Sequence, residues 1–221
     1  MEERPLTNKE RQKRRTLSYF IEAAQKIIAE EGIQGVSIRK VADQAGYNSA
    51  TLYNYFEDVD ELTLIASIKY YLSYTSSLAQ HVRALDDSYE WFMEVWDFFC
   101  DSAFEHPHIF YTLFFGKYND RLSDAVARYY EIFPEEKGRH SAMAEYMFSG
   151  RSILERNQRQ MDCMVKAGHV APQNAVIANE ILTFTFQKLL EDACRQENTT
   201  NVRKMKEHMM CIVAFVIDRA K

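Results

Sequence analysis

Residues 37–56, SIRKVADQAGYNSATLYNYF, are the most informative stretch of this chain of 221 residues. Ser37 is a favourable N-cap, and the apolar residues after it recur at the spacing of a short amphipathic helix. Gly46 then makes a turn, and a second short helix begins with small polar residues and ends in aromatic ones. Two such helices joined by a glycine turn are typical of a helix-turn-helix, whose second helix enters the major groove of DNA. The stretch therefore predicts a DNA-reading unit.

The side chains expected to contact DNA lie at the start of the second helix and around it. Short polar groups there can reach base edges, and hydroxyls and cations beside them suit phosphate oxygens. Contact with DNA is the favoured interpretation for Tyr53, whereas Leu52 and Phe56 are expected to pack the core of the small domain; for Tyr55 both roles stay open. The predicted DNA-binding residues are Ser37, Arg39, Lys40, Asn48, Ser49, Ala50, Thr51, Tyr53, Asn54 and Tyr55.

The charge of the chain is unevenly distributed. The net charge is −5, but residues 1–56 hold nine Lys and Arg against seven Asp and Glu, with the densest basic run between Lys9 and Arg15. A basic N-terminal run is often only a solvated tail. Beside a helix-turn-helix, phosphate contact becomes the favoured interpretation.

The rest of the chain also has helical periodicity, with only seven glycines and four prolines. We predict an all-α protein with an N-terminal three-helix DNA-binding domain at residues 1–57 and a larger helical domain for ligand binding and dimerisation at residues 58–221. The expected helices cover about residues 16–31, 38–45, 49–56, 58–81, 89–105, 108–115, 122–132, 139–167, 173–195 and 200–219.

The last two predicted helices are apolar on more than one face. A helix of this kind is buried on more than one side, and little chain remains to cover both helices. A second copy of the chain is therefore the expected cover, as a homodimer. The residues assigned to the dimer interface are Ile181, Phe184, Leu189, Met209, Ile212 and Val216.

Aromatic residues are concentrated between Tyr89 and Tyr118, with twelve in thirty residues against 13% for the chain. Core packing explains most of them individually, but the density exceeds what packing requires. We therefore expect a large apolar pocket between helices 58–81 and 122–132, with a hydrophobic or aromatic small-molecule ligand. The predicted ligand-binding residues are Tyr70, Tyr74, Trp91, Trp96, Phe99, Phe110, Phe114 and Tyr118.

Three carboxylates lie in the same region: Glu94, Asp97 and Asp101. Beside aromatic faces they could select a lipophilic cation, although a solvated helix face is the favoured interpretation. His106 and His108 have no third ligand at a convincing spacing, so no metal is expected. No motif for a cofactor or for catalysis is recognised, and we do not expect an enzyme.

Two further features bear on the environment of the protein. The four cysteines are scattered without a paired spacing, which favours a reducing, cytoplasmic compartment. No apolar run reaches the ~20 residues that a membrane span needs, and the charged N-terminus is unlike a signal peptide. We expect no membrane partner.

Residues 16–62 resemble the DNA-binding domain of the TetR family of bacterial transcriptional regulators. The resemblance is carried by IIAEEGIQGVSIRKVADQAG at 27–46, SATLYNYF at 49–56 and DEL at 60–62. It implies a homodimer that binds a palindromic double-stranded DNA operator, usually to repress, and that a small molecule bound in the larger domain releases from DNA. One departure is Val59, which stands where the family usually has a phosphate-binding lysine. This departure predicts weaker non-specific DNA affinity, for which the basic N-terminal run can compensate.

Three hypotheses follow from the sequence. The leading one is a ligand-responsive repressor. The second is an activator or a DNA organiser with the same fold and no small effector. The third is a helical carrier or sequestering protein for a hydrophobic ligand, with a weakened DNA-binding head.

Overall fold

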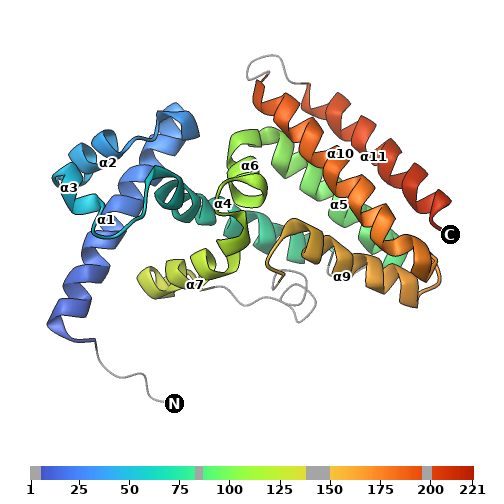
Figure 1. Cartoon of the computed structure of the whole chain (residues 1–221), viewed down its shortest axis with the longest axis horizontal. Coiled ribbons are helices and arrows are strands. Elements are labelled where there is room, and N and C mark those ends of the chain that lie inside the picture. The colour runs from blue at the N-terminus through green and yellow to red at the C-terminus, as the bar shows by residue number, and fades with distance from the viewer. Residues whose placement is uncertain (1–5, 83–86, 138–149, 196–200) are drawn as a thin grey trace. The chain divides into compact units, whose positions relative to one another are not determined.

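The computed structural model describes residues 6–82, 87–137, 150–195 and 201–221, and every regular element among them is a helix (Figure 1). The expected all-α fold is confirmed. Short 3-10 turns lie at Ile33–Gly35, Asn119–Arg121, Pro134–Glu136 and Pro172–Asn174. The α-helices are α1 (Asn8–Glu31), α2 (Ile38–Ala45), α3 (Ser49–Leu52), α4 (Val59–His81), α5 (Ser88–Glu105), α6 (Pro107–Phe115), α7 (Leu122–Ile132), α9 (Ile153–Lys166), α10 (Ala175–Arg195) and α11 (Val202–Arg219).

The chain divides into two compact units. Among the described residues, the first unit holds 6–69 and 124–137, and the second holds the remainder. This division differs from the expected boundary between residues 57 and 58, because α4 contributes to both units and nearly all of α7 belongs to the first. The assignment of residues 1–57 and 58–221 to DNA binding and to ligand binding remains a prediction.

Helix α1 begins about two turns earlier than the apolar periodicity indicated. Thr7 and Glu10 form a capping box: the Glu10 amide donates to Thr7 Oγ1 at 3.2 Å, and the Thr7 amide donates to Glu10 Oε2 at 2.7 Å. Such a box satisfies two backbone donors of the first turn and lets a helix start on polar residues. The basic residues from Lys9 to Arg15 are therefore helical.

The core of the first unit forms around Phe20 of α1, which is fully buried. Its ring lies 5.1 Å from that of Tyr47, 6.1 Å from that of Tyr55 and 6.3 Å from that of Phe56. Gly46 ends α2 in the left-handed conformation, with φ of 76°. Glycine adopts this conformation without the strain that a side chain would cause. The turn thus directs α3 back onto α1.

Helix α10 is central to the second unit, where it contacts α5, α6, α9 and α11 (Figure 1). Phe186 on this helix is fully buried, with its ring 4.7 Å from that of Phe99, 5.7 Å from that of Phe104 and 5.9 Å from that of Trp96. Most of the aromatic residues on α5 and α6 therefore pack this core. No described helix combines the length and the apolar character needed to span a membrane.

The long helix expected over residues 139–167 is wrong at its centre. Gly150 lies outside any helix, and α9 begins only at Ile153. Ser152 caps α9 by accepting a hydrogen bond from the Glu155 amide at 3.2 Å. Side-chain capping favours a helix start, and the amphipathic pattern alone did not reveal the break. Residues 138–149 lie outside the described part of the chain.

Candidate functional site

The helix-turn-helix predicted from residues 37–56 is present in the first unit. The Ser37 side chain caps α2 by accepting from the Lys40 amide at 3.3 Å, and the Asn48 side chain caps α3 by accepting from the Ala50 amide at 2.8 Å. Two of the residues assigned to DNA contact therefore also fix the ends of the helices. Helix α3 ends at Leu52 and is therefore shorter than the helix expected over residues 49–56.

The surface of this motif exposes most of the predicted DNA-binding residues. Tyr53 is 59% exposed, the most exposed aromatic side chain of the first unit that the structure describes. Tyr55 is half-buried against Phe20, so packing accounts for much of its ring. The exposed members of the set are Ser37, Arg39, Lys40, Asn48, Ala50, Tyr53 and Asn54, and the half-buried members are Ser49, Thr51 and Tyr55.

The basic residues around the motif differ in what they contact. Arg39 is almost fully exposed and only loosely paired with Asp43 at 3.9 Å, whereas Lys40 is paired with Glu31. In the basic run of α1, the Arg14 guanidinium donates to the Ile132 carbonyl at 2.8 Å, which gives it a structural role. Arg15 is exposed and donates to the Tyr19 hydroxyl at 2.7 Å, a hydrogen bond that raises the pKa of the guanidinium.

The start of α4 is acidic and is held by Arg128 of α7, a residue that sequence reasoning missed. The Arg128 guanidinium donates to Glu61 Oε1 at 2.6 Å and to the Tyr55 carbonyl at 2.5 Å, and it lies 5.2 Å from the centre of the Phe56 ring. The end of the reading motif, the first turn of α4 and α7 are therefore fastened by one side chain. Glu57 and Asp60 remain exposed.

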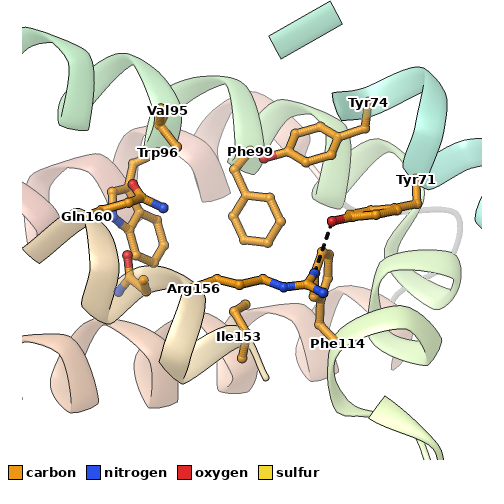
Figure 2. Close-up of a pocket in the computed structure, with 10 residues that line it drawn as sticks. Tyr71, Tyr74, Val95, Trp96, Phe99, Phe114, Ile153, Arg156 and Gln160 are labelled. Carbon is orange, nitrogen blue, oxygen red and sulfur yellow. Dashed lines mark hydrogen bonds between the residues drawn. The ribbon is translucent and has the colours of Figure 1, made fainter. Parts of the chain in front are cut away.

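A cavity of about 50 Å³ lies within the second unit, between α4, α5, α6 and α9 (Figure 2). This cavity differs from the large pocket that was expected between α4 and α7: it is small, and it is closed by α9, because aromatic side chains fill much of the space. About 50 Å³ holds only a few water molecules. A substituted benzene ring would enter only if lining side chains moved.

Four of the eight predicted ligand-binding residues line the cavity: Tyr74, Trp96, Phe99 and Phe114. The other four do not. Tyr70 and Phe110 line a separate pocket of about 170 Å³ between α4, α5 and α6, Tyr118 is buried in the core, and Trp91 is half-buried elsewhere on α5. Lining residues that sequence reasoning missed are Tyr71, Val95, Ile153, Arg156, Asn157 and Gln160.

The sequence did not indicate that polar residues of α9 line the cavity, because α9 has the pattern of an ordinary helix with one polar face. Arg156 and Asn157 are nonetheless buried. Asn157 donates to Asn179 Oδ1 at 2.7 Å, and Asn179 donates to the Leu154 carbonyl at 2.9 Å, so partners on α10 and α9 satisfy this part of the face. On the opposite wall, burial raises the pKa of the Tyr74 hydroxyl well above its ordinary value.

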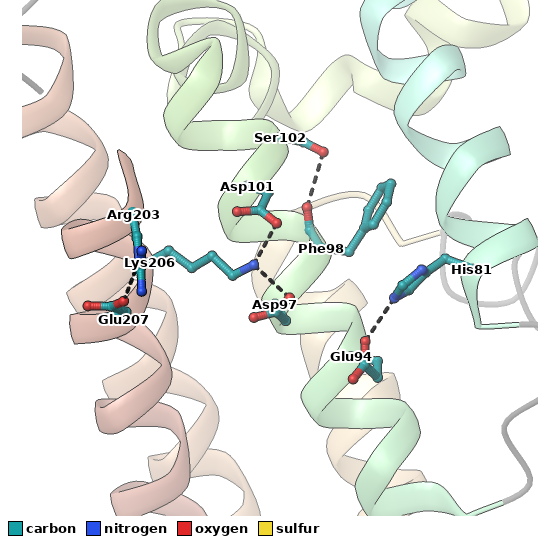
Figure 3. A network of polar contacts seen from close by, with 9 residues as sticks. All are labelled: His81, Glu94, Asp97, Phe98, Asp101, Ser102, Arg203, Lys206 and Glu207. Carbon is teal, nitrogen blue, oxygen red and sulfur yellow. Dashed lines mark hydrogen bonds and ion pairs between the residues drawn. The ribbon is translucent and has the colours of Figure 1, made fainter. Parts of the chain in front are cut away.

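Glu94, Asp97 and Asp101 of α5 do not line the cavity and are paired with Lys206 and His81 outside it (Figure 3). Lys206 of α11 lies 2.7 Å from Asp97 and 2.6 Å from Asp101, and His81 lies 2.8 Å from Glu94. Burial lowers the pKa of Lys206, but the hydrogen bonds to Asp101 and Asp97 outweigh this effect and raise it. Selection of a lipophilic cation by these groups is not supported. Among the described residues, no cluster of potential metal ligands is found.

Helices α10 and α11 carry large apolar side chains that the rest of the chain leaves exposed. Ile181 and Phe184 belong to the predicted dimer interface, and Phe184 is 55% exposed. Met209 and Val216 are buried in the core of the second unit, so these two assignments need correction: the second apolar row of α11 packs against its own chain. Leu189 and Ile212 are half-buried. Sequence reasoning did not include the exposed Val176, Ile177 and Phe215.

Comparisons with known proteins agree with this architecture. Residues 20–64 match the family model described as bacterial regulatory proteins, tetR family. A comparison with curated proteins found no match. Similar solved structures include a proposed TetR-family transcriptional regulator from Syntrophomonas wolfei (14% identity, 93% of this chain and 96% of that one, TM-score 0.58).

Two further structures cover most of both chains. The fatty acid degradation regulator FadR from Bacillus halodurans is 13% identical over 91% of this chain and 94% of its own, with a TM-score of 0.53. RolR in complex with resorcinol is 16% identical over 95% of each chain, with a TM-score of 0.53. The match over residues 20–64 and these structures together show that the chain has the fold of TetR-family regulators, with the family's DNA-binding motif at its N-terminal end.

Proposed function

We propose that the protein is a transcriptional repressor that binds a palindromic operator as a homodimer and is released from it by an aromatic or other hydrophobic small molecule. The observation that carries the proposal is the exposed reading motif. Its short polar residues and Tyr53 lie outside the core, while Leu52 and Phe56 anchor the motif within it. Side chains presented in this way suit base edges and phosphate oxygens.

A dimer is supported by the exposed apolar side chains of α10 and α11. Exposed groups such as Ile181, Phe184 and Phe215 are stabilised when a second copy removes them from water. Two reading motifs related by a dyad enter successive major grooves only at a spacing of ~34–36 Å. A small change in that spacing weakens both half-site contacts together, so the dimer provides the element that a ligand can switch.

Helix α4 supports a route for the switch. Its Tyr71 and Tyr74 line the cavity, and Glu61 in its first turn is held by Arg128 together with the Tyr55 carbonyl. A ligand that expands the cavity has to displace lining side chains, and α4 bears two of them. If the ligand binds the arrangement with displaced side chains more tightly, this difference in affinity supplies the free energy that couples ligand binding to DNA release. The resorcinol bound by RolR is an aromatic molecule, in keeping with the aromatic lining found here.

One observation favours a second candidate, a carrier of a hydrophobic ligand with a weakened DNA-binding head. Glu57 and Asp60 are exposed at the start of α4, and Val59 stands where a phosphate-binding lysine was expected. Acidic groups at this position repel phosphates. A carrier would bind ligand in the cavity and would show no sequence preference for DNA.

The experiment that tests the proposal is selection of duplexes from a random DNA pool, followed by fluorescence anisotropy titration of the enriched sequence at several salt concentrations. We expect a palindrome and an affinity that falls steeply with salt, since each neutralised phosphate contributes about −0.9 to the logarithmic slope. Tyr53→Ala should weaken operator binding by about tenfold or more, as expected for loss of a contact worth 1–3 kcal/mol.

The matched control is Tyr89→Ala, which removes a half-buried tyrosine from α5 in the second unit. It should leave DNA affinity within about twofold of wild type. Enrichment of no sequence above the starting pool would contradict the repressor and favour the carrier. Unchanged affinity in Tyr53→Ala would show that the reading surface has been assigned to the wrong residues.

A further inference from the structure

The cavity contains a buried cation with no anion beside it. Arg156 of α9 is only 6% exposed, and arginine is seldom buried to this extent without a carboxylate partner. Its Nε donates to the Gly150 carbonyl at 2.9 Å, and its Nη1 donates to the Tyr71 hydroxyl at 3.2 Å. Both acceptors are neutral. Within the described part of the chain, no Asp or Glu forms an ion pair with this guanidinium.

Aromatic faces surround the same group. The guanidinium carbon lies 5.5 Å from the centre of the Tyr71 ring and 5.8 Å from that of Phe114. These contacts lessen the cost of burial, but they provide no counter-charge. The Nη2 amino group makes no hydrogen bond among those found between described residues, so part of the donor fork of Arg156 is available at the cavity (Figure 2).

A second polar pair stands at the other end of the cavity. Trp96 Nε1 and Gln160 Oε1 are both buried, and neither atom has a hydrogen-bond partner among the residues that the structure describes. In Figure 2, these two side chains lie together on one side, the Arg156 guanidinium lies on the other beside Tyr71 and Phe114, and the Phe99 ring stands between them. Unpartnered buried donors and acceptors cost free energy, and a ligand that pairs with them recovers it.

We propose that the effector is an aromatic acid, whose carboxylate binds the Arg156 guanidinium and whose far end carries a hydroxyl that pairs with Trp96 and Gln160. The proposal rests on the proposed function, because it names the class of ligand that the cavity would take. A carboxylate matches the arginine fork and supplies the missing negative charge. A hydroxyl both donates and accepts, as the Trp96 donor and the Gln160 acceptor require.

The charges around the cavity favour an anion over a cation. Asp97 and Asp101 of α5 both pair with Lys206 of α11, and neither carboxylate lines the cavity. The remaining lining side chains are aromatic, aliphatic or neutral amides. An organic cation would therefore meet Arg156 without any carboxylate to offset the repulsion.

The test compares ligands of nearly the same shape on the free protein, without DNA. The probes are 4-hydroxyphenylacetate, its neutral amide 4-hydroxyphenylacetamide, and phenylacetate, which lacks the hydroxyl. In a Trp91→Phe protein, Trp96 is the sole tryptophan and its fluorescence reports occupancy of the cavity. We expect the hydroxy acid to bind about tenfold or more tightly than the amide, and more tightly than phenylacetate.

Two arginine variants locate the effect. Arg156→Gln should abolish the preference for the acid over the amide, while Arg151→Gln, which removes an exposed arginine just before α9, should keep it. Equal or tighter binding of the amide, or no change in fluorescence with any probe, would overturn the proposal. Because the matched ligands on the Trp91→Phe protein already decide the question, misfolding of Arg156→Gln would not leave it open. Failure to bind DNA would affect only the proposed function.

Discussion

Single charged residues of this protein join segments that are far apart in the chain. Arg128 connects α7 to Glu61 and to the Tyr55 carbonyl, and Arg156 connects α9 to Tyr71 and to the Gly150 carbonyl. Each guanidinium donates to more than one group and lies over an aromatic ring. Arg128 has a carboxylate partner, whereas no described Asp or Glu pairs with Arg156. The first is therefore expected to be structural, and the second to act in recognition.

Arg128→Ala should destabilise the protein by about 1–3 kcal/mol, because Oε1 of the mostly buried Glu61 carboxylate and the Tyr55 carbonyl lose the guanidinium as a donor. Urea unfolding of wild type, Arg128→Ala, Glu61→Gln and the double variant measures this loss and the coupling between the two side chains. Arg128→Lys is the control: it keeps the positive charge but loses the planar guanidinium that donates to both acceptors at once. Additive single effects would show that the ion pair contributes little.

At the scale of elements, short helices depend on their ends more than long ones do. Helix α3 contains only Ser49–Leu52, so the hydrogen bond from the Ala50 amide to Asn48 Oδ1 satisfies a large share of its free backbone donors. Helix α1 shows the same dependence at Thr7, where a capping box extends a helix into a polar segment. Caps therefore fix where the reading motif and the basic run lie.

Asn48 allows capping and DNA contact to be separated. Asn48→Ala should lower stability by about 0.5–2 kcal/mol through loss of the cap, and should weaken DNA binding as well. Asn48→Asp should keep the stability of wild type, because aspartate is an equally good N-cap, yet weaken DNA binding by placing a carboxylate near phosphates. Thermal unfolding and anisotropy titration measure the two effects. If Asn48→Asp binds DNA as tightly as wild type, Asn48 is a cap and makes no contact with DNA.

At the scale of the whole molecule, the described surface carries apolar groups that the single chain does not cover. Val176, Ile177, Ile181 and Phe184 are exposed along α10, and Phe215, at 63% exposed, is on α11. Exposed side chains of this size on adjacent helices are typical of an interface. Met209 and Val216 are buried within the chain instead, so they stabilise the fold of one chain and not an interface.

Phe184→Glu should shift the protein from dimer to monomer at concentrations where the wild type is dimeric. Burial of one phenylalanine contributes about 1.5–3 kcal/mol, and a twofold dimer contains the residue twice. Light scattering after size-exclusion chromatography measures the mass in solution. Lys166→Glu, which alters an exposed charge on α9, is the control and should leave the mass unchanged. A dimer that persists in Phe184→Glu would place the interface elsewhere.

The sequence by itself determined the all-α fold, the reading motif and most of the helix boundaries, because helical periodicity, caps and the Gly46 turn act between residues close in the chain. The aromatic density of α5 and α6 located three lining residues of the cavity, Trp96, Phe99 and Phe114, and Tyr74 of α4 is a fourth. The density did not reveal Arg156 or Gln160, nor the small size of the space. Only tertiary structure decided these features, since a polar side chain is buried where distant groups satisfy it, and those groups are set by packing and not by local pattern.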